Sequence, residues 1–244
     1  MTPAEMLSFW ETGSRLSPLD RGVLAAQVAG VPASQAADLP LGERNRALAR
    51  LYREHFGRAL KGFTQCVECG EKLEFDFDLQ QVADAPPLKA SEPVVVGRWK
   101  FRLPTSRALA MALNGGEETA AGERLLAHCL EEPAGAGLDW GESGQGLSEA
   151  PPGWSEEEMT AIEEKLSEAD LLAEILIGFK CPECGADFED ALDLGSFLWS
   201  EIEESARQLF DDIHLLASAY GWTEDEVLRL SSMRRQAYVR RVLG

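Results

Sequence analysis

Two Cys-x-x-Cys pairs constrain the fold of this 244-residue chain more than any other feature. The pairs are Cys66/Cys69 and Cys181/Cys184, and more than a hundred residues separate them. In a reducing compartment, such pairs are more often metal ligands or redox centres than structural disulfides. A fold that uses both pairs at one site must bring two distant parts of the chain together.

The two cysteine segments are versions of one repeated unit. Gly70 and Gly185 directly follow the second cysteine of each pair, and an apolar residue, Leu73 or Phe188, comes four positions after that cysteine. Glycine adopts backbone conformations that a side chain would forbid. Each segment is therefore predicted to be a knuckle, a tight turn that presents two sulfur atoms.

Two facing knuckles would complete a metal site with four sulfur ligands. Zn²⁺ takes four ligands in a tetrahedron, and a site filled by four cysteines is structural rather than catalytic. We therefore predict that one structural Zn²⁺ per chain is bound, in a zinc-ribbon-like site, by Cys66, Cys69, Cys181 and Cys184. The alternatives are a redox dithiol and loose thiols. A thioredoxin arrangement requires a helix after the pair, whereas strand-like segments follow here.

The chain as a whole is predicted to be mostly helical, with small β hairpins, and to be cross-linked by the four-cysteine site. Capping boxes and apolar periodicity predict helices over residues 3–13, 18–28, 41–56, 106–114, 123–131, 155–166, 196–220 and 223–230, followed by a last helix. Alternating apolar and polar residues predict strands over residues 72–79 and 94–103.

The longest predicted helix, residues 196–220, carries an apolar stripe. Its members recur at helical spacing and are Leu198, Ile202, Leu209, Ile213 and Leu216. We expect this stripe to pack against the N-terminal helices.

These patterns divide the chain into four segments that we expect to form one interdependent unit. Residues 1–62 are an N-terminal helical region, and residues 63–131 hold the first knuckle with strands and helices. Residues 132–153 are rich in Gly, Pro, Ser and acids, which is typical of a flexible linker. Residues 154–244 hold the second knuckle and the long C-terminal helix.

The charge balance disfavours nucleic acid as a partner of the whole chain. Lys and Arg number 23 against 42 Asp and Glu, which gives a net charge of −19. Such a surface repels phosphate backbones over a Debye length of about 8–10 Å and favours basic protein partners. No stretch approaches the roughly 20 apolar residues of a membrane span, and the N-terminus lacks a basic leader region. We therefore expect a cytoplasmic protein that does not bind a membrane.

The sequence predicts no enzyme and no small-molecule substrate. It contains no Gly-rich phosphate loop, no Gly-x-Ser-x-Gly elbow and no His-Glu-x-x-His motif. His55, His128 and His214 fall on separate predicted helices, so packing or capping roles are favoured. The fifth cysteine, Cys129, is expected to be a buried and inert thiol.

The C-terminal end is the predicted partner-binding site. In an acidic chain it is locally basic, since five arginines gather there: Arg229, Arg234, Arg235, Arg240 and Arg241. Arg, Trp and Tyr dominate interface hot spots. We predict that partner contacts are made by Tyr220, Trp222, Arg234, Arg235 and Tyr238, with both of those arginines exposed. The alternative is that the aromatic residues pack the last helices onto the core and the arginines balance the negative charge of the acidic surface.

Several motifs together resemble one known family. They are Met6-Leu-Ser-Phe-Trp10, Leu39-Pro-Leu41-Gly42-Glu43-Arg44, the knuckle Cys66-Val-Glu-Cys69-Gly70, Phe101-Arg102-Leu103-Pro104-Thr105-Ser106, Phe197-Leu198-Trp199 and the ending Tyr220-Gly221-Trp222 with Arg234-Arg235. In combination and order they resemble the T4-family baseplate hub assembly chaperones of contractile phage tails and related contractile injection systems. The resemblance implies a non-enzymatic assembly factor or minor baseplate component that binds hub or wedge proteins.

The competing hypothesis is a zinc-ribbon regulator that binds nucleic acid. Short predicted helices interrupted at Gly221 and Ser231 could form a helix-turn-helix that ends in arginines. Two features oppose this hypothesis. One is the net charge of −19, and the other is the acidic residues within the knuckles, namely Glu68, Glu71, Glu183 and Asp187.

Overall fold

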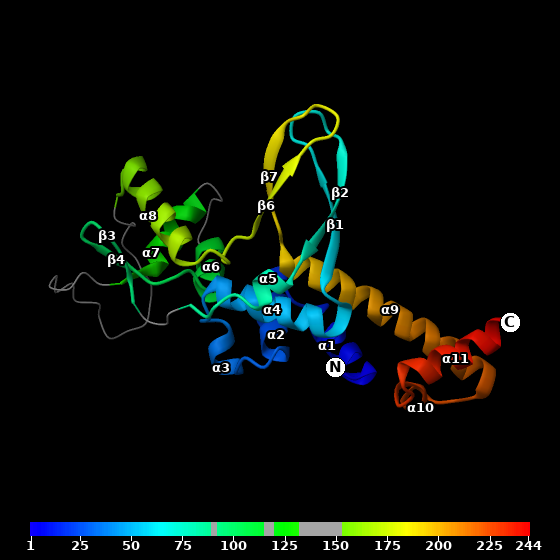
Figure 1. The fold of residues 1–244 in the computed structure, drawn as a ribbon. Helices are drawn as coiled ribbons and strands as arrows, with labels where there is room; N and C mark the ends of the chain where they lie inside the picture. Colours follow the sequence, from blue (N-terminus) through cyan, green and yellow to red (C-terminus); the bar gives the residue numbers. More distant parts are fainter. Residues whose placement is uncertain (89–91, 115–119, 132–152) are drawn as a thin grey trace.

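The computed structural model describes residues 1–88, 92–114, 120–131 and 153–244 of the chain. The described part is mostly helical and contains three small antiparallel sheets, as predicted (Figure 1). Of the expected linker at 132–153, all but Gly153 lies outside the described residues.

A base of packed helices is formed by both ends of the chain. Its elements are α1 (Pro3–Gly13), α2 (Pro18–Val28), α3 (Ala33–Ala36), α4 (Leu41–Phe56), α5 (Gln80–Ala83) and the 27-residue α9 (Leu194–Tyr220). The predicted capping box begins α1, because the Glu5 N–H donates to Thr2 Oγ1 at 3.2 Å and the Thr2 N–H donates to Glu5 Oε2 at 2.7 Å. The long helix begins two residues before its predicted start, because Asp193 caps it through the Ser196 N–H.

The main hydrophobic core joins α9 to the N-terminal helices. Leu198, Ile202 and Leu209 of α9 are buried in one cluster with residues such as Phe9 and Leu48. The first quarter and the last quarter of the chain therefore share one core.

The prediction that the whole α9 stripe faces the N-terminal helices is wrong for its last member. Leu216 is buried with Val227 and Val239 in a separate small cluster. These partners belong to α10 (Glu224–Leu228) and α11 (Ser232–Leu243), which fold back onto the last turns of α9 (Figure 1). Glycine permits this reversal, since Gly221 ends α9 in the left-handed conformation with φ +68°.

Two β hairpins stand side by side on the helical base and meet at their tips (Figure 1). Antiparallel pairing joins β1 (Ala59–Gln65) to β2 (Lys72–Asp78), and β6 (Leu176–Lys180) to β7 (Asp187–Ala191). We call this pair of hairpins the finger. Below the tips, the rings of Phe75 and Phe179 lie 5.4 Å apart between centroids, and Thr64 Oγ1 donates a 2.5 Å hydrogen bond to Asp190.

A smaller lobe lies beside the base and has its own core. It contains the sheet of β3 (Val94–Val96), β4 (Trp99–Phe101) and β5 (Leu130–Glu131), with helices α6 (Ser106–Leu113), α7 (Ala121–Cys129) and α8 (Glu156–Ala169). Phe101, Trp154 and Ile162 are buried together there.

Two predicted elements of this lobe are wrong in their extent. The single strand expected over 94–103 is a hairpin, because Gly97 and Arg98 form a two-residue turn in which Val96 pairs with Trp99. Gly97 has φ +57°, a conformation that glycine adopts without strain and that such turns favour. The helix expected over 123–131 runs instead from 121 to 129, and the next two residues pair with β4 as β5.

Asp170 links the smaller lobe to the base. It follows α8 and is buried, and its Oδ2 accepts a 2.9 Å hydrogen bond from the Gly42 N–H at the start of α4. Asn45 Nδ2 donates to the Leu172 carbonyl at 2.8 Å close by. Burial raises the pKa of the Asp170 carboxyl, although the backbone N–H groups around it act in the opposite direction.

Substitution of Gly42 by alanine is expected to break this link. A Cβ at this position would lie 1.8 Å from Asp170 Oδ1, so the buried carboxylate or the helix must shift. We expect Gly42→Ala to lower the free energy of unfolding, measured by chemical denaturation, by about 1–3 kcal/mol. Gly22→Ala in α2 is the matched control. Its Cβ would come no closer than 3.7 Å to a flexible Arg44 side chain, so it should be neutral or stabilising by up to about 1 kcal/mol. Equal stabilities for the two variants would contradict the expectation.

Candidate metal centre

The two knuckles have the same local structure, as the sequence repeat predicts. In each, the glycine N–H donates to the carbonyl oxygen of the first cysteine, at 2.9 Å for Gly70 to Cys66 and 3.0 Å for Gly185 to Cys181. The N–H of the first cysteine in turn donates to the carbonyl five residues later, at 2.8 and 2.9 Å. Gly70 and Gly185 have φ values of +77° and +76°, which explains why glycine occupies both positions.

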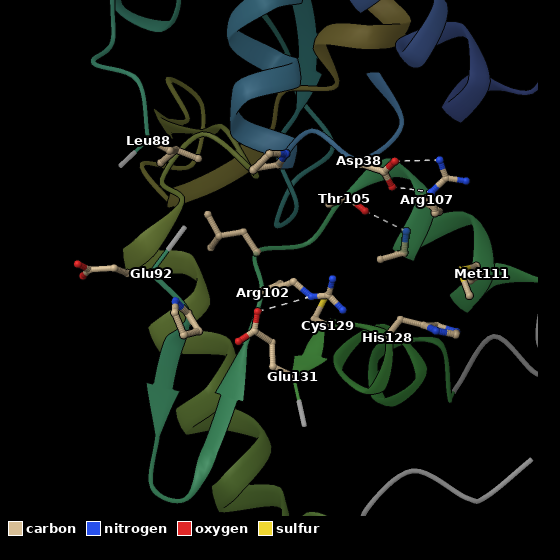
Figure 2. Close-up of a pocket in the computed structure, with 14 residues that line it drawn as sticks. Asp38, Leu88, Glu92, Arg102, Thr105, Arg107, Met111, His128, Cys129 and Glu131 are labelled. Carbon is tan, nitrogen blue, oxygen red and sulfur yellow. Dashed lines mark hydrogen bonds and ion pairs between the residues drawn. The ribbon is translucent and has the colours of Figure 1, made fainter. Parts of the chain in front are cut away.

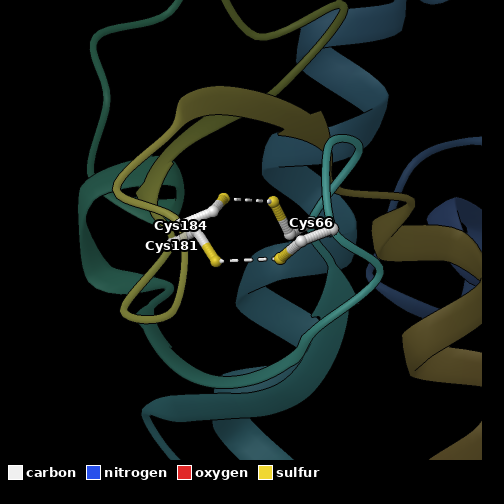
Figure 3. Close-up of side chains that lie close together, drawn as sticks. Cys66, Cys181 and Cys184 are labelled. Atoms are coloured by element: carbon white, nitrogen blue, oxygen red, sulfur yellow. Dashed lines mark hydrogen bonds between the residues drawn. The ribbon is translucent and has the colours of Figure 1, made fainter.

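The finger brings the four cysteines of the two pairs into one cluster (Figure 3). All four Sγ atoms lie within 4.8 Å of one another. Across the two knuckles, Cys66 Sγ is 3.7 Å from Cys184 Sγ, and Cys69 Sγ is 3.5 Å from Cys181 Sγ. A tetrahedral site with Zn–S bonds of 2.3 Å has sulfur atoms about 3.8 Å apart, whereas a disulfide bond is about 2.05 Å long. The cluster therefore has the dimensions of a four-sulfur metal site, and its cysteines are free thiols.

The local environment of the thiols differs from one cysteine to the next. Cys66 and Cys181 are buried, whereas Cys69 and Cys184 are exposed. Hydrogen bonding from the Cys184 backbone N–H lowers the pKa of Cys181 to about 7. The Glu71 N–H acts in the same direction on Cys69, but hydrogen bonding with the neighbouring thiols, above all Cys181, and partial loss of hydration outweigh it and raise the pKa of Cys69 to about 12. Metal coordination needs thiolates, so it must release protons from this cluster.

The aromatic residues of the predicted partner-binding site come together at the end of α9. The rings of Tyr220 and Trp222 are stacked with centroids 4.8 Å apart, and Tyr238 of α11 meets Trp222 edge-on at 4.9 Å. Tyr220 remains 42% exposed, and Arg234 is exposed on α11.

The expectation that Arg235 is exposed is wrong. The residue is 7% exposed, and its Nε donates to Asp212 Oδ2 of α9 at 2.9 Å. The reason is helical spacing, because Arg235 and Val239 lie four residues apart on the side of α11 that packs against α9. That spacing, together with the buried acid on α9, is the signal that could have assigned Arg235 a structural role.

A pocket that the sequence did not reveal lies between the base and the smaller lobe (Figure 2). It has a volume of about 600 Å³ and is lined by two ion pairs, Arg107 with Asp38 at 2.5 Å and Arg102 with Glu131 at 3.8 Å. Burial raises the pKa of Cys129, at the pocket wall, to about 11. This thiol is therefore protonated at neutral pH, as an inert cysteine should be.

The fold and the site together define a mostly helical protein whose two β hairpins meet at a four-cysteine cluster. Comparisons with protein-family models, with curated proteins and with solved structures find no match to the chain. Among the described residues, no helix combines the length and the apolar character needed to cross a bilayer.

Proposed function

We propose that this protein is a non-enzymatic assembly factor or minor structural component of a contractile-tail baseplate, held in shape by one structural Zn²⁺. The observation that carries the metal part of this proposal is the meeting of four sulfur atoms from two distant hairpins. The support for the baseplate part is the resemblance of the sequence motifs to hub assembly chaperones, which implies hub or wedge proteins as partners.

The donor set suits zinc. Thiolates are soft ligands, and a tetrahedral group of four is typical of structural zinc. Cys66, Cys69, Cys181 and Cys184 would hold the ion and leave no coordination position for a substrate. Zinc would act here as a cross-link.

Such a cross-link would stabilise the two hairpins of the finger. A two-stranded hairpin is at best marginally stable by itself. Below the tips, the contacts between the two hairpins include the rings of Phe75 and Phe179 and the Thr64–Asp190 hydrogen bond. A metal ion at the tips would fix both hairpins and keep the finger rigid.

Affinity purification tests the proposed partner class. The tagged, metal-replete protein would be isolated from cells that are assembling contractile tails, and the co-purifying proteins would be quantified by mass spectrometry against an untagged control. We expect baseplate hub or wedge proteins to be enriched. If no tail protein is enriched above the control, the proposed function is wrong.

The alternative function, a zinc-ribbon regulator that binds nucleic acid, has one observation in its favour. Arg234, Arg240 and Arg241 are exposed together on α11. Against it, the exposed residues around the knuckles include Glu68, Glu71, Glu183 and Asp187. A salt titration with random duplex DNA separates the two functions. A regulator should show an affinity that falls steeply with salt, whereas the assembly factor should show negligible binding.

A further inference from the structure

Helix α11 carries three exposed arginines that have no partner within the described part of the chain. The guanidinium groups of Arg234, Arg240 and Arg241 make no hydrogen bond, ion pair or ring contact there. Every other arginine of the protein has such a contact, for example Arg229 with Asp225 at 3.0 Å and Arg235 with Asp212 at 2.9 Å. In a chain of net charge −19, three unpaired arginines on one helix are an exception.

The helix itself does not explain all three positions. Arg240 and Arg241 lie in the last turn, where the helix dipole stabilises a cation. Arg234 lies in the first turn, where the same dipole disfavours a cation, and α11 contains no acidic residue that could compensate. A partner that brings negative charge to this face would supply what is missing.

The spacing along the helix defines what such a partner must present. Arg234, Tyr238 and Arg241 are four and three residues apart, so they lie one above the other on α11. The two arginines are seven residues apart, which is about 10.5 Å along the helix axis. We call the side of α11 formed by Arg234, Tyr238 and Arg241 the basic face. Tyr238 lies between the two arginines and contacts Trp222, so the basic face borders the aromatic cluster at the end of α9.

Charge complementarity selects a short acidic peptide segment over a long polyanion. The guanidinium fork matches a carboxylate with two parallel hydrogen bonds. Helix α10, which like α11 packs against α9, exposes Glu224, Asp225 and Glu226. A long nucleic-acid backbone would extend over the surface of a chain with net charge −19, whereas a short acidic segment can be confined to the arginines of α11.

We infer that the exposed face of α11 binds a short acidic segment of a partner protein, in which two carboxylates about 10 Å apart pair with Arg234 and Arg241 on either side of Tyr238. Glutamates seven residues apart on a helix meet this requirement. The inference rests on the proposed function and specifies the chemistry of its partner.

Fluorescence anisotropy with a designed probe tests the inference on the full-length, metal-replete protein. The probe is a labelled helical peptide with two glutamates seven residues apart and a leucine between them, and the control peptide carries glutamines at those two positions. We expect the glutamate peptide to bind more tightly. The double variant Arg234→Gln with Arg241→Gln should bind it about tenfold more weakly, which corresponds to about 1.4 kcal/mol.

The matched control variant is Arg15→Gln with Arg207→Gln. It removes the same charge from two exposed arginines that pair with nearby carboxylates, Glu11 and Glu204. This control should change binding less than twofold if the α11 face is specific. Equal losses in the two double variants, or equal binding of the two peptides, would overturn the inference. So would tighter binding of duplex DNA or of phosphatidylserine vesicles, or a dimer of this protein that only the α11 variant abolishes.

The failure of this inference can be distinguished from the failure of the proposed function. If tail proteins co-purify equally with the wild type and with the α11 double variant, the proposed function stands and the α11 inference is wrong. If the α11 variant loses the peptide but no tail protein co-purifies with the wild type, the surface is real and the proposed function is wrong.

Discussion

Substitution of any one of the four clustered cysteines by serine is expected to remove the metal ion and disorder the finger. Structural zinc sites contribute about 10–16 kcal/mol of apparent binding free energy, which equals or exceeds the roughly 5–15 kcal/mol total stability of a typical domain. Cys181→Ser is the strongest test, since this residue is buried and lies 3.5 Å from Cys69. We expect a loss of several kcal/mol in the free energy of unfolding, together with metal content near zero.

The fifth cysteine provides the matched control for this experiment. Cys129 is buried in the smaller lobe, outside the cluster. Cys129→Ala should cost about 1 kcal/mol through lost packing and leave the metal content unchanged. The account of the finger would be contradicted if Cys181→Ser kept its full metal content and the stability of the wild type.

The second large effect is expected at the buried ion pair that holds α11 against α9. Asp212 is 2% exposed, and its carboxylate accepts hydrogen bonds from Arg235 Nε, Gln208 Nε2 and Gln236 Nε2. Asp212→Asn keeps the shape but leaves the Arg235 charge buried without a counter-charge. Such a change costs about 3–5 kcal/mol. Hydrogen exchange should show that the loss is concentrated in α10, α11 and the last turns of α9.

An apolar replacement of both partners is the control for the ion pair. Asp212→Leu with Arg235→Met removes both charges and keeps a similar volume, so the double variant should be about as stable as the wild type or more stable. If Asp212→Asn alone leaves the exchange of α11 unchanged, the ion pair does not hold this helix in place.

The features predicted well from the sequence are those determined locally. The capping boxes at Thr2, Ser155 and Thr223 each begin a helix, because their hydrogen bonds lie within four residues of chain. The four-cysteine cluster was also predictable, although its halves are far apart in sequence. Two similar knuckles supply two ligands each, and a four-ligand site needs both, so the sequence indicated that they should meet.

The features missed by the sequence depend on tertiary contacts or on a single turn residue. Gly97 interrupts a run of strand-forming residues. The prediction of one continuous strand over 94–103 did not include the turn that Gly97 makes possible. The burial of Arg235 depends on α11 folding back onto α9, and its helical spacing from Val239 identifies the buried side of α11 only once that packing is known. The pocket has no local signal because its lining comes from several separate segments.

X-ray absorption at the zinc edge, on reduced protein of known metal content purified without added zinc, tests the central claim most directly. The account predicts one zinc ion per chain, coordinated by four sulfur atoms at about 2.3 Å. Less than half an equivalent of zinc, or a first coordination shell that requires nitrogen or oxygen ligands, would contradict it.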